Sequence, residues 1–413
     1  MTDDPSAQQH DRTGAERWGI VALLDARWMW VLAVLAGITA AVLLPVLWDH
    51  TGADLKVYRL GGDTILTDPS ALYSARLPRI SLPFTYPPFA ALVFVPFALL
   101  PWPLAYGVSI ASSIAALWLI LRYSLRHPRL RTAAMVVAVA VCLLVEPVRE
   151  TLSYGQINLF LCALVMYDVL DRKHAGRGVW IGVAAGIKLT PLVFVAWLLV
   201  TRQWRALRYA AATFCGTVLI GFVFAPSASW EYWTRLVFNA GRIGPPAFAG
   251  NQSWNGLLVR FGAPSSGAVW MVLVLATVVA GLWLSRRLYD QGQMLASLCV
   301  CATVGLLCAP ISWDHHWVWM IPMGVALAKT VPARRPLVRL AVAAAWFGYF
   351  IAGPFRWVPQ AFDREYDWTL GQQLPGNAYI LAGIAAVTMI AITSMTRRAR
   401  QQTKYPSTQY SGQ

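Results

Sequence analysis

The segment VWIGVAAGIKLTPLVFVAWLLV, residues 179–200, decides much of the architecture of the chain. It is long and apolar enough to cross a bilayer, yet a cluster of basic residues lies directly before it and another directly after it. Because such clusters remain on the cytoplasmic side, both ends of the segment must lie on one side of the membrane. Gly186 and Pro191 interrupt a helix on either side of Lys188. The segment therefore predicts a re-entrant hairpin with Lys188 at its bend.

The whole composition agrees with a polytopic membrane protein. Of 413 residues, 57% are hydrophobic and only 13% are charged. The formal charge of +15 would otherwise suggest a nucleic-acid partner, but the basic residues form short clusters between apolar runs, as membrane loops do. Nucleic acid is therefore excluded as a partner. Since a bilayer-spanning segment without a barrel pattern must be helical, the expected fold class is all-α.

The apolar runs set the number of crossings. They lie near 29–48, 86–100, 104–121, 132–148, 157–170, 179–200, 206–225, 266–285, 294–310, 315–329, 336–353 and 376–395. We expect about 10–12 transmembrane helices, several of them short. The basic clusters that mark the cytoplasmic face are Arg122/Arg126/Arg129/Arg131, Arg172/Lys173/Arg177, Arg202/Arg205/Arg208, Arg286/Arg287, Lys329/Arg334/Arg335/Arg339 and Arg397/Arg398/Arg400.

These signals predict a simple domain organisation. A cytoplasmic segment, 1–28, precedes one transmembrane catalytic domain, 29–396, and a polar cytoplasmic tail, 397–413, follows it. The run beginning at Met29 has no cleavage site after it and is expected to stay as an anchor. The region 86–121 is expected to make one net crossing, broken at its PWP motif, although two short crossings violate the charge rule only once.

The same orientation collects the polar segments on the outer face. They are 49–85, 149–156, 226–265 and 354–375, together with the corner 311–316. Most of the acidic residues lie in these segments, including the long first outer loop, 49–85. We therefore expect any active site to face the extracytoplasmic side.

Candidate site residues begin in the first outer loop. Asp54 and Tyr58 are four residues apart and share a helical face, while Arg59 points elsewhere. A carboxylate at the water–lipid boundary can accept a proton from a sugar hydroxyl, and nearby cations can hold a phosphate. The alternative is a solvated loop acid with no such role.

Three further polar side chains lie where apolar runs begin. Tyr86 precedes two prolines, and Gln156 and Asn158 are amides at the outer start of a helix that can bind sugar hydroxyls. The alternative is helix capping and an aromatic belt. Lys188 is harder to explain structurally, because an ammonium within an apolar hairpin needs an anionic partner unless it extends to the interface. A lipid phosphate is such a partner.

The stretch ISWDHHWVWMIP, residues 311–322, carries Asp314, His315 and His316 in apolar and aromatic surroundings. Adjacent side chains on a helix point about 100° apart, so these three cannot chelate one ion alone; no metal-ligating residue is predicted, and a metal site is possible only with distant ligands. A histidine there can donate a hydrogen bond or a proton to an anionic group, with Asp314 fixing its tautomer. The alternative is a hydrated interfacial histidine. The six cysteines lie in apolar runs without a CxxC pair, and no Gly-rich phosphate loop occurs.

Several motifs together carry a family resemblance. They are ADLKVYRLGG (53–62), LPFTYPPFAALVFVPFALLP (82–101), YGQINLFL (154–161), GIKLTPLVF (186–194), SWEYW (229–233), NQSWNG (251–256) and PISWDHHWVWMIP (310–322). With them the chain resembles the actinobacterial polyprenol-phosphate-mannose-dependent mannosyltransferases of the C-type glycosyltransferase superfamily, from about residue 25 to 330. It is most similar to members that act on phosphatidylinositol mannosides.

The resemblance implies the C-type glycosyltransferase fold in the cell membrane and an active site on the extracytoplasmic face. It implies transfer of mannose from polyprenyl-phosphate-mannose to a phosphatidylinositol mannoside, forming an α-(1→2) linkage with inversion and without a cofactor. Asp54 matches the family's essential acid and is the implied base; His315 and His316 are implied to line the same cavity. Asp314 leaves their division of roles open, and His316 could be the base with Asp54 orienting it. Lys188, Arg59 and a histidine are the cations for the leaving phosphate.

Two other functions remain as alternatives. An arabinofuranosyltransferase that uses decaprenyl-phosphate-arabinose would need the same base and phosphate site. A transporter or flippase for lipid-linked sugars would also have broken helices and an intramembrane lysine. Transporters usually contain two repeated halves, and no internal repeat is visible here. We therefore rank transport behind glycosyl transfer.

Overall fold

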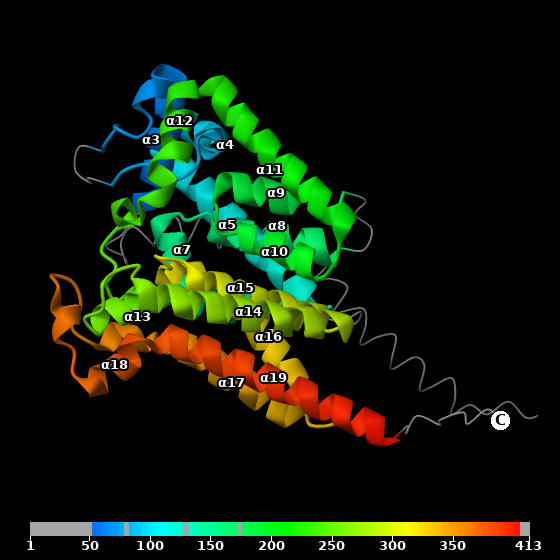
Figure 1. Cartoon of the computed structure of the whole chain (residues 1–413). Helices are drawn as coiled ribbons and strands as arrows, with labels where there is room; N and C mark the ends of the chain where they lie inside the picture. Colours follow the sequence, from blue (N-terminus) through cyan, green and yellow to red (C-terminus); the bar gives the residue numbers. More distant parts are fainter. Residues whose placement is uncertain (1–51, 78–81, 127–131, 172–175, 405–413) are drawn as a thin grey trace, which may run out of the picture.

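The computed structural model of the chain describes residues 52–77, 82–126, 132–171 and 176–404 (Figure 1). The regular secondary structure of the described residues is helical, with turns and loops between the helices, and an isolated bridge joins Asn251 and Trp313. The expected cytoplasmic segment 1–28, the apolar run 29–48 and the end of the polar tail lie outside the described residues. The helix that carries the start of that tail continues to Lys404.

Long apolar helices form the membrane part of the molecule. The described residues contain five helical segments long and apolar enough to cross a bilayer: α5 (Trp102–Leu125), α11 (Trp204–Phe224), α14 (Ala268–Asp290), Pro336–Trp357, which begins with α17 (Pro336–Ala352), and Ala378–Thr396 within α19 (Ala378–Lys404). A sixth is counted when α7 (Glu146–Tyr154) and α8 (Asn158–Leu170), bent by 115°, are one broken span. Shorter apolar helices are α4 (Pro88–Leu99), α6 (Thr132–Leu144) and α15 (Met294–Cys308), and the short helix α16 (Met320–Thr330) follows α15 in the sequence. The prediction of an all-α multi-pass membrane protein is confirmed, and the total of about 10–12 crossings stays a prediction.

Small polar elements gather at one end of the long helices. Figure 1 shows α11, α14 and α19 extending from one end of the molecule, where α12, α13 and α18 lie, to the other. The elements at that end include α3 (Ala53–Thr67), α12 (Pro226–Thr234), α13 (Trp254–Arg260), α18 (Leu370–Gly376) and the 3₁₀ turns η4 (Asp314–Trp319), η5 (Pro354–Trp357) and η6 (Arg364–Asp367). They come from the segments that the sequence places on the outer face.

The segment 179–200 forms the predicted hairpin. Helix α9 (Val179–Ile187) ends just before Lys188, and α10 (Leu192–Val200) begins after Pro191. Gly178 lies against Ala206, and Gly182 lies against Ala210, so α9 runs alongside and parallel to the start of α11. Because α11 follows directly after α10, the chain must reverse direction between α9 and α10. The close approach needs glycine at these positions, and Gly178 has a φ of 100° besides.

The region 86–121 divides at its prolines as expected. Helix α4 has 12 residues and spans about 18 Å, short of a bilayer, whereas α5 has 24. Helix α4 packs on α3 instead, where the Tyr58 ring stacks on Phe94 with centroids 4.1 Å apart and Gly62 meets the Phe94 backbone. This arrangement favours one net crossing.

A buried polar cluster holds the corner 311–316 in place. Asn251 Oδ1 accepts a hydrogen bond from the backbone N–H of Ser312 (2.9 Å), and the backbone N–H of Gln252 donates to the Ser312 carbonyl (2.7 Å). Gln252 Nε2 donates to the Gly376 carbonyl, and its Oε1 accepts from the Tyr379 amide. The NQSWNG motif therefore ties this corner to the C-terminal helices, and the turn η4 that follows is positioned by it.

Candidate active site

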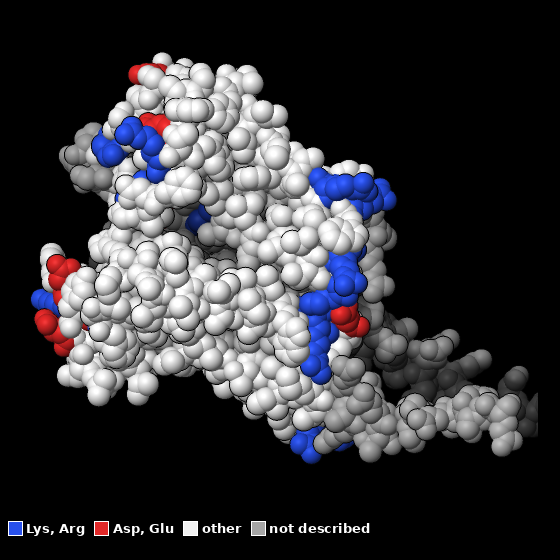
Figure 2. All heavy atoms as spheres, viewed as in Figure 1, with Lys and Arg blue, Asp and Glu red and all other residues white. Residues whose placement is uncertain are grey.

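A cavity of about 630 Å³ opens among the elements at this end of the molecule. Figure 2 shows a hollow between the upper and lower groups of helices, with a basic side chain visible inside it. Seven of the ten predicted site residues line the cavity: Asp54, Tyr86, Gln156, Lys188, Asp314, His315 and His316. They come from five segments that are separate in the sequence, so the fold brings the predicted residues together.

Asp54 is half-buried at the start of α3, and its carboxylate is held by Gln156. Gln156 Nε2 donates to Asp54 Oδ2 at 2.7 Å. The amide is held in this orientation because its Oε1 accepts from the Tyr58 hydroxyl (2.8 Å) and the Tyr86 hydroxyl (3.3 Å). Among the described residues no hydrogen bond or ion pair occupies Oδ1, so this oxygen is left to a substrate. Burial raises the pKa of Asp54, and the hydrogen bond from Gln156 partly offsets that rise.

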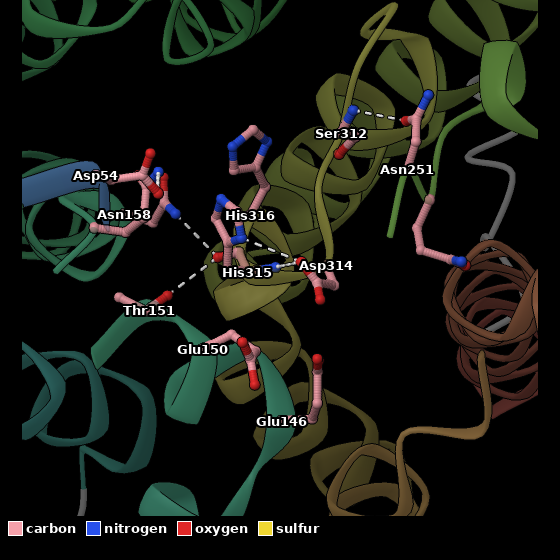
Figure 3. Close-up of polar contacts among 12 residues, drawn as sticks. Asp54, Glu146, Glu150, Thr151, Asn158, Asn251, Ser312, Asp314, His315 and His316 are labelled. Carbon is pink, nitrogen blue, oxygen red and sulfur yellow. Dashed lines mark hydrogen bonds and ion pairs between the residues drawn. The ribbon is translucent and has the colours of Figure 1, made fainter. Parts of the chain in front are cut away.

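His315 pairs with Asp314 and is neutral. Its Nδ1 lies 3.1 Å from Asp314 Oδ1, and burial lowers its pKa to about 4. Nδ1 therefore carries the proton, and Nε2 is an acceptor. That Nε2 is buried and has no hydrogen-bond partner among the described residues. The His315 carbonyl accepts from Thr151 and Asn158, which fixes the backbone of η4 (Figure 3).

His316 pairs with Lys188 rather than with Asp54. Lys188 Nζ lies 3.0 Å from His316 Nε2 and 2.9 Å from Asn158 Oδ1, and it sits 5.4 Å from the centre of the Tyr86 ring. Burial, and next the Lys188 charge, hold the pKa of His316 well below its usual value, so the imidazole accepts from the ammonium. The lone pair a base would use is thus occupied. Among the described residues Lys188 forms no ion pair, so its charge is available to an anion in the cavity.

Sequence reasoning missed a charge cluster behind His315. Arg356 Nη2 lies 2.7 Å from Glu146 Oε1, 2.9 Å from Glu150 Oε1 and 3.4 Å from Asp314 Oδ2. Glu146 is fully buried, and its Oε2 accepts from the Tyr379 hydroxyl at 2.7 Å. Glu146 is an acidic residue inside the apolar run 132–148. Because buried charges are rare without a partner, it was the signal from which this cluster could have been predicted. The cluster positions Asp314 and thereby His315.

Three predicted residues do not line the cavity. Tyr58 is buried behind it and acts only through Gln156 and Tyr86, and Asn158 holds Lys188 from behind. Arg59 is turned away, because its guanidinium donates to the Leu100 carbonyl at 2.6 Å and lies over the Trp102 ring. The expectation that Arg59 helps to bind the leaving phosphate is therefore not supported by this structure.

The arrangement suits transfer at a sugar carbon next to a phosphate. It brings a carboxylate with a free oxygen, an ammonium without an ion pair and neutral imidazoles to the wall of one cavity. Among the described residues no group of three or more acidic, histidine or cysteine side chains has the geometry to hold a metal ion.

Comparison with known proteins places the chain in a family. The sequence profile of glycosyltransferase family 87 matches residues 84–310. A polyprenol-phosphate-mannose-dependent alpha-(1-2)-phosphatidylinositol mannoside mannosyltransferase of Mycolicibacterium smegmatis is 34% identical over 397 residues, which cover 87% of this chain and 89% of that protein. The corresponding pentamannoside mannosyltransferase of Mycobacterium tuberculosis is 33% identical over 388 residues, 87% of this chain and 89% of that protein.

A more distant relative has another sugar in its name. An alpha-(1->3)-arabinofuranosyltransferase of Corynebacterium glutamicum is 26% identical over 305 residues, 65% of this chain and 70% of that protein. No solved structure matches the chain. Since the family profile covers more than half of the residues and the mannosyltransferases match nearly the whole length, the chain belongs to glycosyltransferase family 87.

Proposed function

We propose that this protein transfers mannose from polyprenyl-phosphate-mannose to a phosphatidylinositol mannoside and forms an α-(1→2) linkage with inversion. The names of the relatives supply the donor and the acceptor. The observation that carries the proposal is the cavity itself, which brings Asp54, Lys188 and the two histidines together.

Asp54 acts as the base in this mechanism. Its free Oδ1 takes the proton from the acceptor 2-hydroxyl as the oxygen attacks the anomeric carbon of the donor. The bond from that carbon to the phosphate oxygen breaks on the opposite face, and its electron pair stays on the polyprenyl phosphate. Because the Gln156 amide holds Oδ2, the carboxylate is oriented before the acceptor arrives.

Lys188 stabilises the leaving phosphate. The phosphate gains negative charge as the glycosidic bond breaks, so a fixed ammonium binds it more tightly in the transition state than in the ground state. His316 and Asn158 aim this ammonium into the cavity. The Asp314 carboxylate keeps the neighbouring His315 neutral with its proton on Nδ1, so this imidazole adds no charge beside Lys188.

The active site faces the extracytoplasmic side in this proposal. Figure 2 shows most of the visible lysine and arginine side chains gathered at the end of the molecule far from the elements around the cavity. Such clusters mark the cytoplasmic side of membrane proteins. The cavity, at the opposite end, then opens toward the outer leaflet.

The sugar is assigned to mannose over arabinofuranose on sequence similarity. The mannosyltransferases are 33–34% identical over most of the chain, whereas the arabinofuranosyltransferase is 26% identical over 65% of it. Competition between the two polyprenyl-phosphate sugars in one assay separates these functions.

The test is transfer by the purified protein from synthetic polyprenyl-phosphate-mannose to a tetramannosylated phosphatidylinositol. We expect an α-(1→2)-mannosylated product and a loss of at least about 10²-fold in kcat for Asp54→Asn. Asp63→Asn is the matched control, because Asp63 is exposed on the same helix and does not line the cavity. Near wild-type turnover of Asp54→Asn would exclude Asp54 as the base, and transfer of arabinose alone would overturn the substrate assignment.

A further inference from the structure

Arg242 is a second cation in the cavity wall that the mechanism does not use. It lies in the turn η3 (Ala240–Ile243), between α12 and α13, and is half-buried. Its Nη2 donates to the Thr85 carbonyl at 2.9 Å and its Nη1 to the Phe84 carbonyl at 3.4 Å. The guanidinium also lies 5.3 Å from the Tyr73 ring centre and 5.7 Å from that of Tyr232. It is therefore fixed in place without using most of its five donors.

The charges in the cavity wall are unequally compensated. The basic residues that line it are Lys188, Arg242 and Arg356. Arg356 is surrounded by three carboxylates. Within the described part of the chain, Lys188 and Arg242 each lack an ion pair and bind only uncharged groups. A partly desolvated cation without a counter-ion is costly, so both positions favour an anionic ligand.

The two cations without an ion pair, Lys188 and Arg242, contact different residues of the segment 84–86. Lys188 is over the Tyr86 ring and joins the buried polar groups beside Asp54. Arg242 binds the carbonyls of Phe84 and Thr85, and the apolar side chains Leu82 and Ile243, which also line the cavity, are about 40% exposed. Arg242 thus combines a guanidinium that has no ion pair with exposed apolar surface, which suits the phosphodiester and the acyl chains of a phospholipid respectively.

We propose that Arg242 binds the phosphodiester of the acceptor lipid. This inference rests on the proposed function, in which each substrate carries one phosphate. The donor phosphate is bonded to the reacting carbon and must lie beside Asp54 and Lys188, so it cannot also occupy a separate site. The second uncompensated cation is therefore assigned to the inositol phosphodiester. A planar guanidinium that binds phosphate in a bidentate manner also orients the lipid headgroup relative to the mannose that is extended.

The rival explanation is that Arg242 only ties η3 to the segment 84–86. A purely structural role would affect both substrates and any acceptor alike. An acceptor without phosphate, such as an octyl α-mannoside, separates the two explanations, because the proposed interaction is missing from it.

The experiment measures KM for both substrates in wild type, Arg242→Gln, Arg242→Lys and the control Arg235→Gln, whose side chain is exposed outside the cavity. We expect Arg242→Gln to raise the KM for the phosphatidylinositol mannoside about tenfold or more and to leave the donor KM within about twofold. Arg242→Lys should recover part of the loss, and kcat/KM for octyl α-mannoside should not change. An equal loss with both acceptors, or a rise only in the donor KM, overturns the proposal.

Direct binding keeps this test separate from the proposed function. Binding of the phosphatidylinositol mannoside in the absence of donor is followed by the tryptophan fluorescence of the protein. Weaker binding to Arg242→Gln than to wild type supports the site even if no mannose is transferred, and equal binding refutes it. Absence of transfer by the wild type would refute the proposed function alone.

Discussion

Replacing Gln156 by leucine tests how the base is prepared. In the wild type, Gln156 Nε2 donates to Asp54 Oδ2 at 2.7 Å, and the hydroxyls of Tyr58 and Tyr86 both point at Gln156 Oε1. Leucine has a similar size and provides no donor. The Asp54 carboxylate then loses a hydrogen bond that stabilises its charged form, while the burial that raises its pKa remains.

The size of the effect follows from the strength of that bond. A hydrogen bond to a charged group contributes about 1.5–3 kcal/mol, and one pKa unit corresponds to about 1.4 kcal/mol. The pKa of Asp54 should therefore rise by about 1–2 units in Gln156→Leu. A base must be deprotonated to act, so activity increases as the pH rises through its pKa. A higher pKa moves this acidic limb of the pH–rate profile to higher pH by the same amount.

The assay is kcat/KM for mannose transfer between about pH 4 and pH 9, with the wild type and Tyr58→Phe as references. Tyr58→Phe removes one hydroxyl from Gln156 Oε1 and leaves the hydrogen bond from Gln156 to Asp54. The acidic limb of its pH–rate profile should therefore shift less than that of Gln156→Leu. At a pH above both limbs, Gln156→Leu should recover much of its activity. An acidic limb that stays in place, or moves to lower pH, would refute the claim that Gln156 tunes Asp54 as the base.

Three further perturbations test other parts of the structure. Lys188→Met should lower kcat by about 10²–10³-fold, because it removes a charge that stabilises the transition state. The control is Lys56→Met, which should leave turnover near wild type because the Lys56 ammonium lies over Trp102 and does not line the cavity. Equal losses of kcat in the two variants would refute the role of Lys188 at the phosphate. Arg356→Met leaves three carboxylates without their cation and should lower the free energy of unfolding by about 3 kcal/mol. This is the lower end of the range for buried pairs, because the Arg356 side chain is 36% exposed. The measurement is the unfolding temperature in detergent, which should fall. Gly182→Leu places a side chain against the Ala210 carbonyl and the Phe214 amide and should destabilise the protein by about 1–3 kcal/mol. The control is Gly216→Ala, whose added methyl group meets nothing within 4 Å and should leave stability unchanged. Equal unfolding temperatures for these two variants would contradict the packing of α9 on α11.

Much of the membrane architecture could be predicted because its signals are local. Apolar length and flanking basic residues are both visible in the sequence, and together they predict the reversal of the chain at Lys188. The close packing that supports the reversal is less visible. Gly178 and Gly182 read as ordinary small residues in an apolar helix, and only the structure shows that they adjoin the backbone of α11.

The charged cluster behind His315 depends on long-range contacts that local patterns do not contain. Arg356 is 210 residues away from Glu146 and 42 from Asp314, and it comes from a loop with several other charges. Neither its spacing nor its neighbours single it out. Arg59 shows what the helical period can predict: its spacing turns it away from the face of Asp54, and in α3 its guanidinium reaches the Leu100 carbonyl.

The two histidines show why roles within a site need coordinates. They are adjacent in sequence, but the 3₁₀ turn η4 sets their rings at 87° to each other with centroids 4.9 Å apart. One imidazole therefore reaches Asp314 and the other reaches Lys188. The partner decides the chemistry: the carboxylate beside Nδ1 keeps His315 neutral with its Nε2 buried, whereas an ammonium on the Nε2 of His316 uses up the lone pair that a base would need. Asp54 is then left as the base, and His316 serves the leaving phosphate through the lysine that it holds.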